Sequence, residues 1–142
     1  MISMIRSGFV LSFILTLILI AVIPRDSAAQ TTSGAESPAL IGVKMDAEWC
    51  PKCKVMNPKL EEVMPEFQGE DILFLKFNMT DDFTIYQTSL LAKRLGLTEL
   101  FEQHKGQTGY MVIVDAHTHE VIKRLNSDLS EEELKTQIAE LL

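Results

Sequence analysis

The stretch Ala47-Glu48-Trp49-Cys50-Pro51-Lys52-Cys53-Lys54 holds both cysteines of the 142-residue chain and its only tryptophan. Two cysteines three positions apart at the start of a helix lie on the same face, one turn apart. That spacing brings their Cα atoms within the roughly 4.4–6.8 Å that a disulfide requires. A Cys-x-x-Cys pair that follows a strand and opens a helix therefore indicates a thiol–disulfide motif.

The same position favours a reactive Cys50. Unpaired backbone N–H groups and the positive end of the helix dipole stabilise a thiolate at a helix start. Lys52 and Lys54 add positive charge, and a stabilised thiolate is what makes a cysteine reactive. Pro51 suits the first helical position because its missing N–H had no intrahelical partner. We expect Cys50 to be the exposed attacking sulfur and Cys53 to be the more covered resolving sulfur.

The motif resembles that of the thioredoxin superfamily, where Trp-Cys-x-x-Cys-Lys is followed by a proline, here Pro58. The similarity extends to the family's next strand at residues 73–78 and to its closing hairpin at 110–115 and 120–125. In all it covers about residues 40–142. The resemblance implies an α/β fold, a thioredoxin-like three-layer α/β/α sandwich with a central mixed sheet. It also implies that no bound cofactor is needed, because the electrons travel in the cysteine pair.

Residues 1–29 are typical of an export signal. Arg6 precedes an apolar or hydroxyl-bearing run at residues 9–23, and small residues suited to cleavage stand at 27–29. The run of about 15 residues is shorter than the roughly 20 that a membrane span needs, although an uncleaved anchor stays open as an alternative. We expect an exported protein, periplasmic or secreted, with a linker at residues 30–38 and the thioredoxin-like domain at 39–142.

Charge and compartment narrow the function classes. The net charge of −7 argues against nucleic acid and anionic membrane surfaces as partners. Outside the cytosol a disulfide can be a structural staple. A bridge that closes only two intervening residues constrains the unfolded chain very little, which favours a redox role for Cys50 and Cys53.

Apolar spacing and capping residues predict the remaining elements. Residues 72–77 are apolar apart from Lys76, as expected of a buried parallel strand. Pro58 should kink the first helix rather than end it. The predicted strands are 40–45, 72–77, 110–114 and 120–125, and the predicted helices are 50–67, Asp81 or Asp82 to about Gly96, 98–104 as an inserted short helix, and one opened by the capping box Ser130–Glu133.

Thr108 and Gly109 mark one departure from the family. Thioredoxin-like proteins usually carry a cis-proline just before the strand that here begins at Tyr110, and its neighbour pairs with the substrate chain. We expect Thr108 and Gly109 to form this facing wall, with a trans peptide bond at Gly109, since cis bonds are rare without proline. The missing proline should leave more room around the two sulfurs, which could admit a metal.

A second departure lies beneath the motif. The family keeps a buried acid six residues before the first cysteine, where this chain has Lys44, and Lys76 matches the family's partner lysine. Asp46, on the same strand face as Lys44, is the nearest candidate partner for it. Our hypothesis is that Lys44 or Asp46 tunes Cys53; alternatively, Lys44 extends outward and has no chemical role.

These patterns favour an exported thiol–disulfide oxidoreductase that acts on protein thiols and disulfides through Cys50 and Cys53. Trp49 would shape the rim of the site and Lys52 would set its local charge. A redox partner must reset the pair, and the N-terminal apolar segment could tether the protein to a membrane. One alternative is a protein that handles copper or zinc through the two thiolates. Another is a binding module without catalysis.

Histidines could in principle complete a metal site. His117 and His119 lie in the predicted turn at residues 115–119, and His104 lies in the insertion. Their His-x-His spacing is not that of a zinc finger, and this turn should lie far from the cysteines. We interpret them as surface residues.

Overall fold

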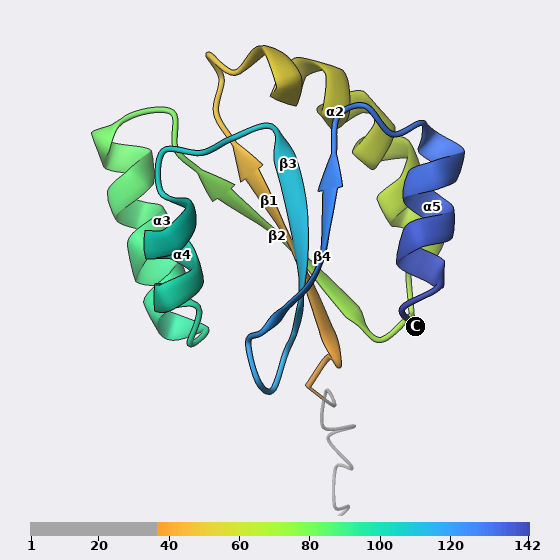
Figure 1. The fold of residues 1–142 in the computed structure, drawn as a ribbon. Helices are drawn as coiled ribbons and strands as arrows, with labels where there is room; N and C mark the ends of the chain where they lie inside the picture. The colour runs from red at the N-terminus through yellow and green to blue at the C-terminus, as the bar shows by residue number, and fades with distance from the viewer. Residues whose placement is uncertain (1–36) are drawn as a thin grey trace, which may run out of the picture. The chain divides into compact units, whose positions relative to one another are not determined.

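The computed structural model describes residues 37–142 (Figure 1). The elements in chain order are β1 (Leu40–Asp46), α2 (Pro51–Val63), the 3-10 helix η1 (Met64–Phe67), β2 (Ile72–Asn78), α3 (Asp82–Arg94), α4 (Thr98–His104), β3 (Tyr110–Asp115), β4 (Val121–Asn126) and α5 (Glu131–Ala139). The strands form one sheet in the order β2-β1-β3-β4. β1 pairs with β2 in parallel and with β3 antiparallel, and β3 pairs antiparallel with β4, so the sheet is mixed as predicted.

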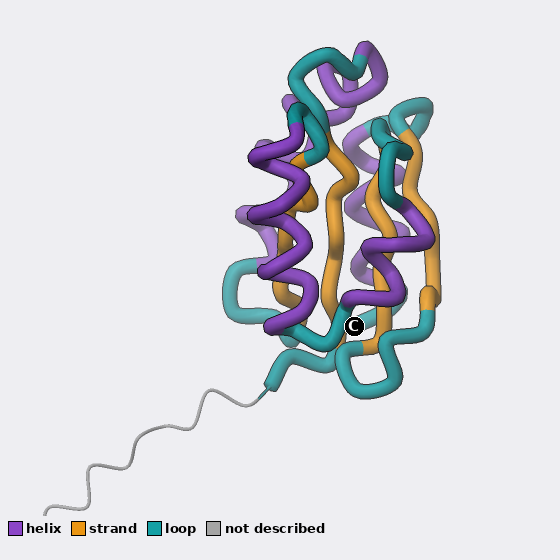
Figure 2. Tube along the Cα trace, turned by 90° about the vertical axis from the view of Figure 1, so that its left-hand side faces the viewer, coloured by secondary structure: helices purple, strands orange, loops and turns teal. Residues whose placement is uncertain are grey.

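Helices cover both faces of this sheet. Figure 1 shows α2 and α5 on one face and α3 and α4 on the other, and Figure 2 looks onto the α3 and α4 side. The hydrophobic residues accordingly divide into two clusters, one per face. The predicted three-layer sandwich is confirmed.

Strand β1 contributes to both clusters because its side chains alternate between the faces. Ile41, Val43 and Met45 belong to the cluster under α3 and α4, while Leu40 belongs to the cluster under α2 and α5. By the same alternation, Lys44 and Asp46 lie on the α2 side. The two polar side chains of this strand therefore lie on the same side of the sheet as the helix that begins with the cysteine motif.

Two expectations about the elements were wrong. The first helix does not run uninterrupted to Phe67: α2 continues past Pro58 but ends at Val63, and η1 follows with Pro65 near its start. Proline lacks the N–H that would continue the α-helical ladder. β2 is parallel as predicted but is not buried as a whole, because it is an edge strand in which only Phe77 is fully covered.

The capping predictions were confirmed. Asp81 caps α3 and exchanges hydrogen bonds with Thr84, while Ser130 and Glu133 form the capping box of α5. The inserted short helix is α4. The predicted signal segment at residues 1–29 and most of the linker lie outside the described residues. Between residues 37 and 142, each helix is too short or too polar to span a bilayer.

Candidate active site

The cysteine motif occupies the junction between β1 and α2. The Cys50 N–H donates to the Ala47 carbonyl at 3.2 Å, which closes the turn after the strand. Cys50 is the N-cap of α2, Pro51 follows at the start of the helix, and the Cys53 N–H donates to Cys50 Sγ at 3.1 Å. An N–H group that already points at this sulfur would stabilise a Cys50 thiolate after reduction.

Cys50 and Cys53 are joined in a disulfide, with their Cα atoms 5.3 Å apart. This distance agrees with the one expected for two cysteines one helical turn apart. Cys53 Sγ also lies 3.7 Å from the Met45 carbonyl oxygen. A reduced Cys53 thiol has an acceptor there, whereas Cys50 Sγ faces a donor. The two sulfurs therefore have opposite hydrogen-bonding surroundings.

The expectation that Cys50 is exposed was wrong. Only 3% of Cys50 is exposed, against 2% of Cys53. The segment before β3 contributes to this cover: a β-carbon built on Gly109 would lie 3.4 Å from Cys50 Sγ and 2.5 Å from Lys52 Cβ. This contact could not be predicted from the sequence, because Gly109 comes close to the motif only when β3 pairs with β1.

Gly109 is held in this place by the sheet. Its N–H donates to the Met45 carbonyl oxygen at 2.9 Å, the same oxygen that faces Cys53 Sγ. Its φ of 91° is in the left-handed region that favours glycine. No peptide bond between residues 37 and 142 is cis, so the trans prediction was confirmed. Both cysteines are buried, with Gly109 close to Cys50 Sγ, and whether the missing proline leaves room for a metal stays a prediction. Thr108, half-buried, precedes Gly109 in the same segment.

A charged cluster lies beneath α2. Lys44 Nζ is 3.4 Å from Asp46 Oδ1, and Lys76 Nζ is 4.0 Å from Asp46 Oδ2. Lys44 and Lys76 are direct partners across β1 and β2, so Asp46 supplies a negative charge to both. The predicted Lys44–Asp46 pairing is present, and the side chain of Lys44 is only 15% exposed. Lys44 does not extend freely into solvent as the alternative supposed.

Asn57 also belongs to this cluster, and the sequence analysis did not predict it as a site residue. Its Nδ2 donates to Asp46 Oδ1 at 3.3 Å. Its Oδ1 is buried and has no hydrogen-bond partner within the described part of the chain. The available signal was its position four residues after Cys53, which places both side chains on the inner face of α2.

Trp49 forms an exposed rim beside the disulfide. Its side chain is fixed by a hydrogen bond from Nε1 to the Thr80 carbonyl oxygen at 3.0 Å, yet the residue is 56% exposed. The Glu48 N–H donates to Thr80 Oγ1 at 3.1 Å, so the motif is linked to the segment before α3. Lys52 and Lys54 are exposed and leave positive charge on the α2 side of the site.

His104 and His119 make contacts with residues other than the two cysteines. His104 Nδ1 is 2.8 Å from the Tyr110 hydroxyl, and the His119 ring packs against Gly96. No group of three or more His, Cys, Asp or Glu side chains gathers as a candidate metal site among residues 37–142.

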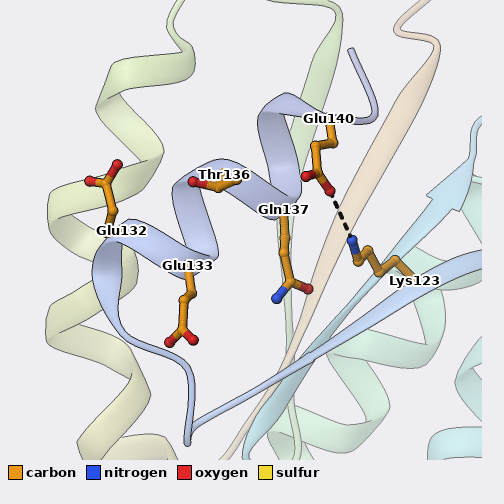
Figure 3. A pocket seen from close by; sticks show the side chains of 6 residues that line it. All are labelled: Lys123, Glu132, Glu133, Thr136, Gln137 and Glu140. Atoms are coloured by element: carbon orange, nitrogen blue, oxygen red, sulfur yellow. Dashed lines mark ion pairs between the residues drawn. The ribbon is translucent and has the colours of Figure 1, made fainter.

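One open hollow lies between β4 and α5 (Figure 3). It is lined by Lys123, Glu132, Glu133, Thr136, Gln137 and Glu140, and an ion pair of 3.5 Å joins Lys123 to Glu140. Neither cysteine contributes to it, so we assign the chemistry to the α2 start and not to this hollow.

Comparison with known proteins gives one family match. The model of the family described as Thioredoxin matches residues 27–89, which include the cysteine motif, α2, β2 and part of α3. Thioredoxin F, chloroplastic, of Oryza sativa subsp. japonica is 37% identical over 60 residues, which are 42% of this chain and 28% of the relative. The chain thus matches less than a third of the length of this curated relative.

Solved structures give weaker similarities. The oxidised thioredoxin of Plasmodium falciparum aligns with a TM-score of 0.47 and 16% identity, over 73% of this chain and 82% of that one. Trxlp of Edwardsiella tarda aligns with a TM-score of 0.46 and 21% identity, over 71% and 82% of the two chains.

Proposed function

We propose that the chain is a member of the thioredoxin superfamily and an extracytoplasmic thiol–disulfide oxidoreductase that acts on protein substrates through Cys50 and Cys53. The observation that carries the proposal is the Cys50–Cys53 disulfide at the N-terminus of α2, with a backbone donor on one sulfur and a backbone acceptor beside the other. The extracytoplasmic location rests on the sequence of residues 1–29 alone.

The reaction is a two-step exchange. In the reducing direction the Cys50 thiolate attacks a substrate disulfide, forms a mixed disulfide and expels one substrate thiolate. Cys53 gives up its proton and attacks Cys50 Sγ, which closes the Cys50–Cys53 disulfide and expels the second substrate thiolate. Two electrons pass to the substrate, and both expelled thiolates take up protons. The same steps in reverse oxidise a substrate dithiol.

The groups around the two sulfurs suggest a role for each residue in the exchange. The Cys53 N–H holds negative charge on Cys50 Sγ, while the Met45 carbonyl favours a protonated Cys53 until its turn to attack. Cys50 is buried and Gly109 lies close to its sulfur, so a substrate sulfur reaches Cys50 only when the segment at Gly109 or the start of α2 shifts.

The test is to trap the intermediate with Cys53→Ser. This variant can form the mixed disulfide but cannot resolve it. Proteins captured from the native compartment should therefore migrate on a non-reducing gel as complexes that dithiothreitol separates by reduction. Cys50→Ser is the matched control and should capture nothing. Equal capture by both variants, or by neither, would refute the exchange mechanism.

The direction of electron flow needs a second measurement. Equilibration of the wild-type pair with a glutathione buffer gives its reduction potential. A value near −270 mV would indicate a reductant like thioredoxin, and one near −120 mV an oxidant. A redox partner that resets the pair belongs to the proposal in either case.

A further inference from the structure

Helix α3 carries an apolar stripe on its outer side. Phe83, Tyr86 and Leu90 are 69%, 58% and 46% exposed. Their spacing of three and four residues puts them in one row along the helix. The buried residues of α3, Thr88 and Ala92, lie on the opposite side. A surface helix normally directs polar residues outward, so packing within the described chain does not account for this stripe.

The stripe continues the rim of the disulfide site. β1 and β2 are parallel, so α2 and α3, which follow them, both begin at the same edge of the sheet. Trp49, adjacent to Cys50, donates its indole N–H to the Thr80 carbonyl, and Phe83 follows Thr80 in the first turn of α3. Figure 1 shows α3 running from this edge down the outside of the sheet. Exposed aromatic side chains therefore extend from the redox motif along α3.

Negative charge borders the start of this surface. Glu48 is exposed beside Trp49, and Asp81 and Asp82 are exposed at the N-terminus of α3. The two lysines of the motif lie on α2 instead. A partner that fits this side must bury apolar side chains along α3 and place basic groups where it meets Glu48, Asp81 and Asp82.

We propose that Trp49 with Phe83, Tyr86 and Leu90 is a docking surface for the protein that exchanges its disulfide with Cys50. The occupant is an apolar segment of that protein, flanked by Lys or Arg and continuous with its reacting cysteine. The inference rests on the proposed function and names its substrate class. The stripe from Phe83 to Leu90 is about 10 Å long at 1.5 Å per residue, so a short arm of the partner suffices to cover it.

The test compares three disulfides as oxidants of the reduced full-length protein. The first is a cyclic-disulfide peptide with an arm of Leu, Phe and Lys residues, the second carries an arm of Ser and Glu, and the third is 2-hydroxyethyl disulfide. Loss of protein thiols after acid quenching gives each second-order rate constant. We expect the apolar basic peptide to react about tenfold faster than the acidic one, the equivalent of one or two buried contacts.

The variant Phe83→Ser, Tyr86→Ser, Leu90→Ser should abolish this preference and leave the rate with 2-hydroxyethyl disulfide unchanged. The matched control is Val121→Ser with Ile122→Ser. These residues are 46% exposed each on the edge strand β4, and Val121 pairs with Val114 near the end of β3 remote from Gly109. This variant should retain the preference. Thermal unfolding of both variants should stay close to wild type, because the changed side chains are exposed.

The outcomes separate the two proposals. A preference that survives in the α3 variant, or falls equally in the β4 variant, would refute the docking surface. So would an α3 variant that changes only the sedimentation coefficient, since the stripe would then join copies of this chain. A wild-type protein inert toward 2-hydroxyethyl disulfide would refute the redox function, and the docking role with it.

Discussion

Gly109 lies against Lys52 so closely that a β-carbon on Gly109 would stand 2.5 Å from the β-carbon of Lys52. The contact joins the segment before β3 to the first turn of α2, and the same β-carbon would lie 3.4 Å from Cys50 Sγ. Its closeness depends on the absence of a side chain at position 109. The close approach of this segment to the disulfide therefore requires a glycine at position 109.

Gly109→Ala should destabilise the protein by about 1–3 kcal/mol, because alanine is strained at this φ and its methyl group would collide with Lys52. Gly106→Ala is the matched control. Its φ of 79° is also positive, but nothing lies within 4 Å of the added carbon, so only the backbone cost of about 1 kcal/mol applies. Urea unfolding of the oxidised proteins measures both. Equal losses would show that the Lys52 contact is not tight.

Asp46→Asn should lower the free energy of unfolding by about 1–2 kcal/mol, because the partly buried Lys44 loses its counter-ion. Lys76→Gln should change it by less than about 0.5 kcal/mol, because the Lys76 side chain is 56% exposed and its contact is 4.0 Å long.

If Asp46 also tunes Cys53, Asp46→Asn shifts the reduction potential of the pair and Lys76→Gln does not. Potentials unmoved in both Asp46→Asn and Lys44→Met would contradict that tuning.

Local sequence could predict the features that depend on neighbouring residues. Helix and strand periodicity predicts the disulfide spacing and places Lys44 and Asp46 on one strand face. Capping residues at the helix starts predict the caps at Asp81 and Ser130. The cover of Cys50 by Gly109 could not be predicted in this way, because it requires β3 to pair with β1. The exposure of β2 likewise depends on strand order, which composition does not specify.

Asp81→Ala should lower the free energy of unfolding, because the Thr84 N–H that donates to Asp81 Oδ1 at 2.8 Å loses its acceptor. It should also change the fluorescence of Trp49, whose indole is bound to Thr80 next to this cap. Ser130→Ala removes the equivalent cap of α5 and should cost about as much without affecting Trp49. A fluorescence change of equal size in both variants would show that the start of α3 does not position Trp49.

His104 should make stability fall on mild acidification. Burial, and secondarily the positive charge of Arg124, hold the pKa of His104 below its ordinary value of 6.5. The unfolded chain therefore binds a proton at higher pH than the folded one. The free energy of unfolding should decrease as the pH falls from about 6.5 to the lowered folded pKa, and it should level off below that.

The measurement is urea unfolding of the wild type and of His104→Gln between about pH 5 and pH 8. Glutamine keeps a polar group near the Tyr110 hydroxyl, which lies 2.8 Å from His104 Nδ1, but it does not titrate. The slope in this window should therefore be smaller in His104→Gln. His117→Gln, at an exposed turn position, is the control and should retain the wild-type slope. A wild-type slope preserved in His104→Gln would assign the titration to another group.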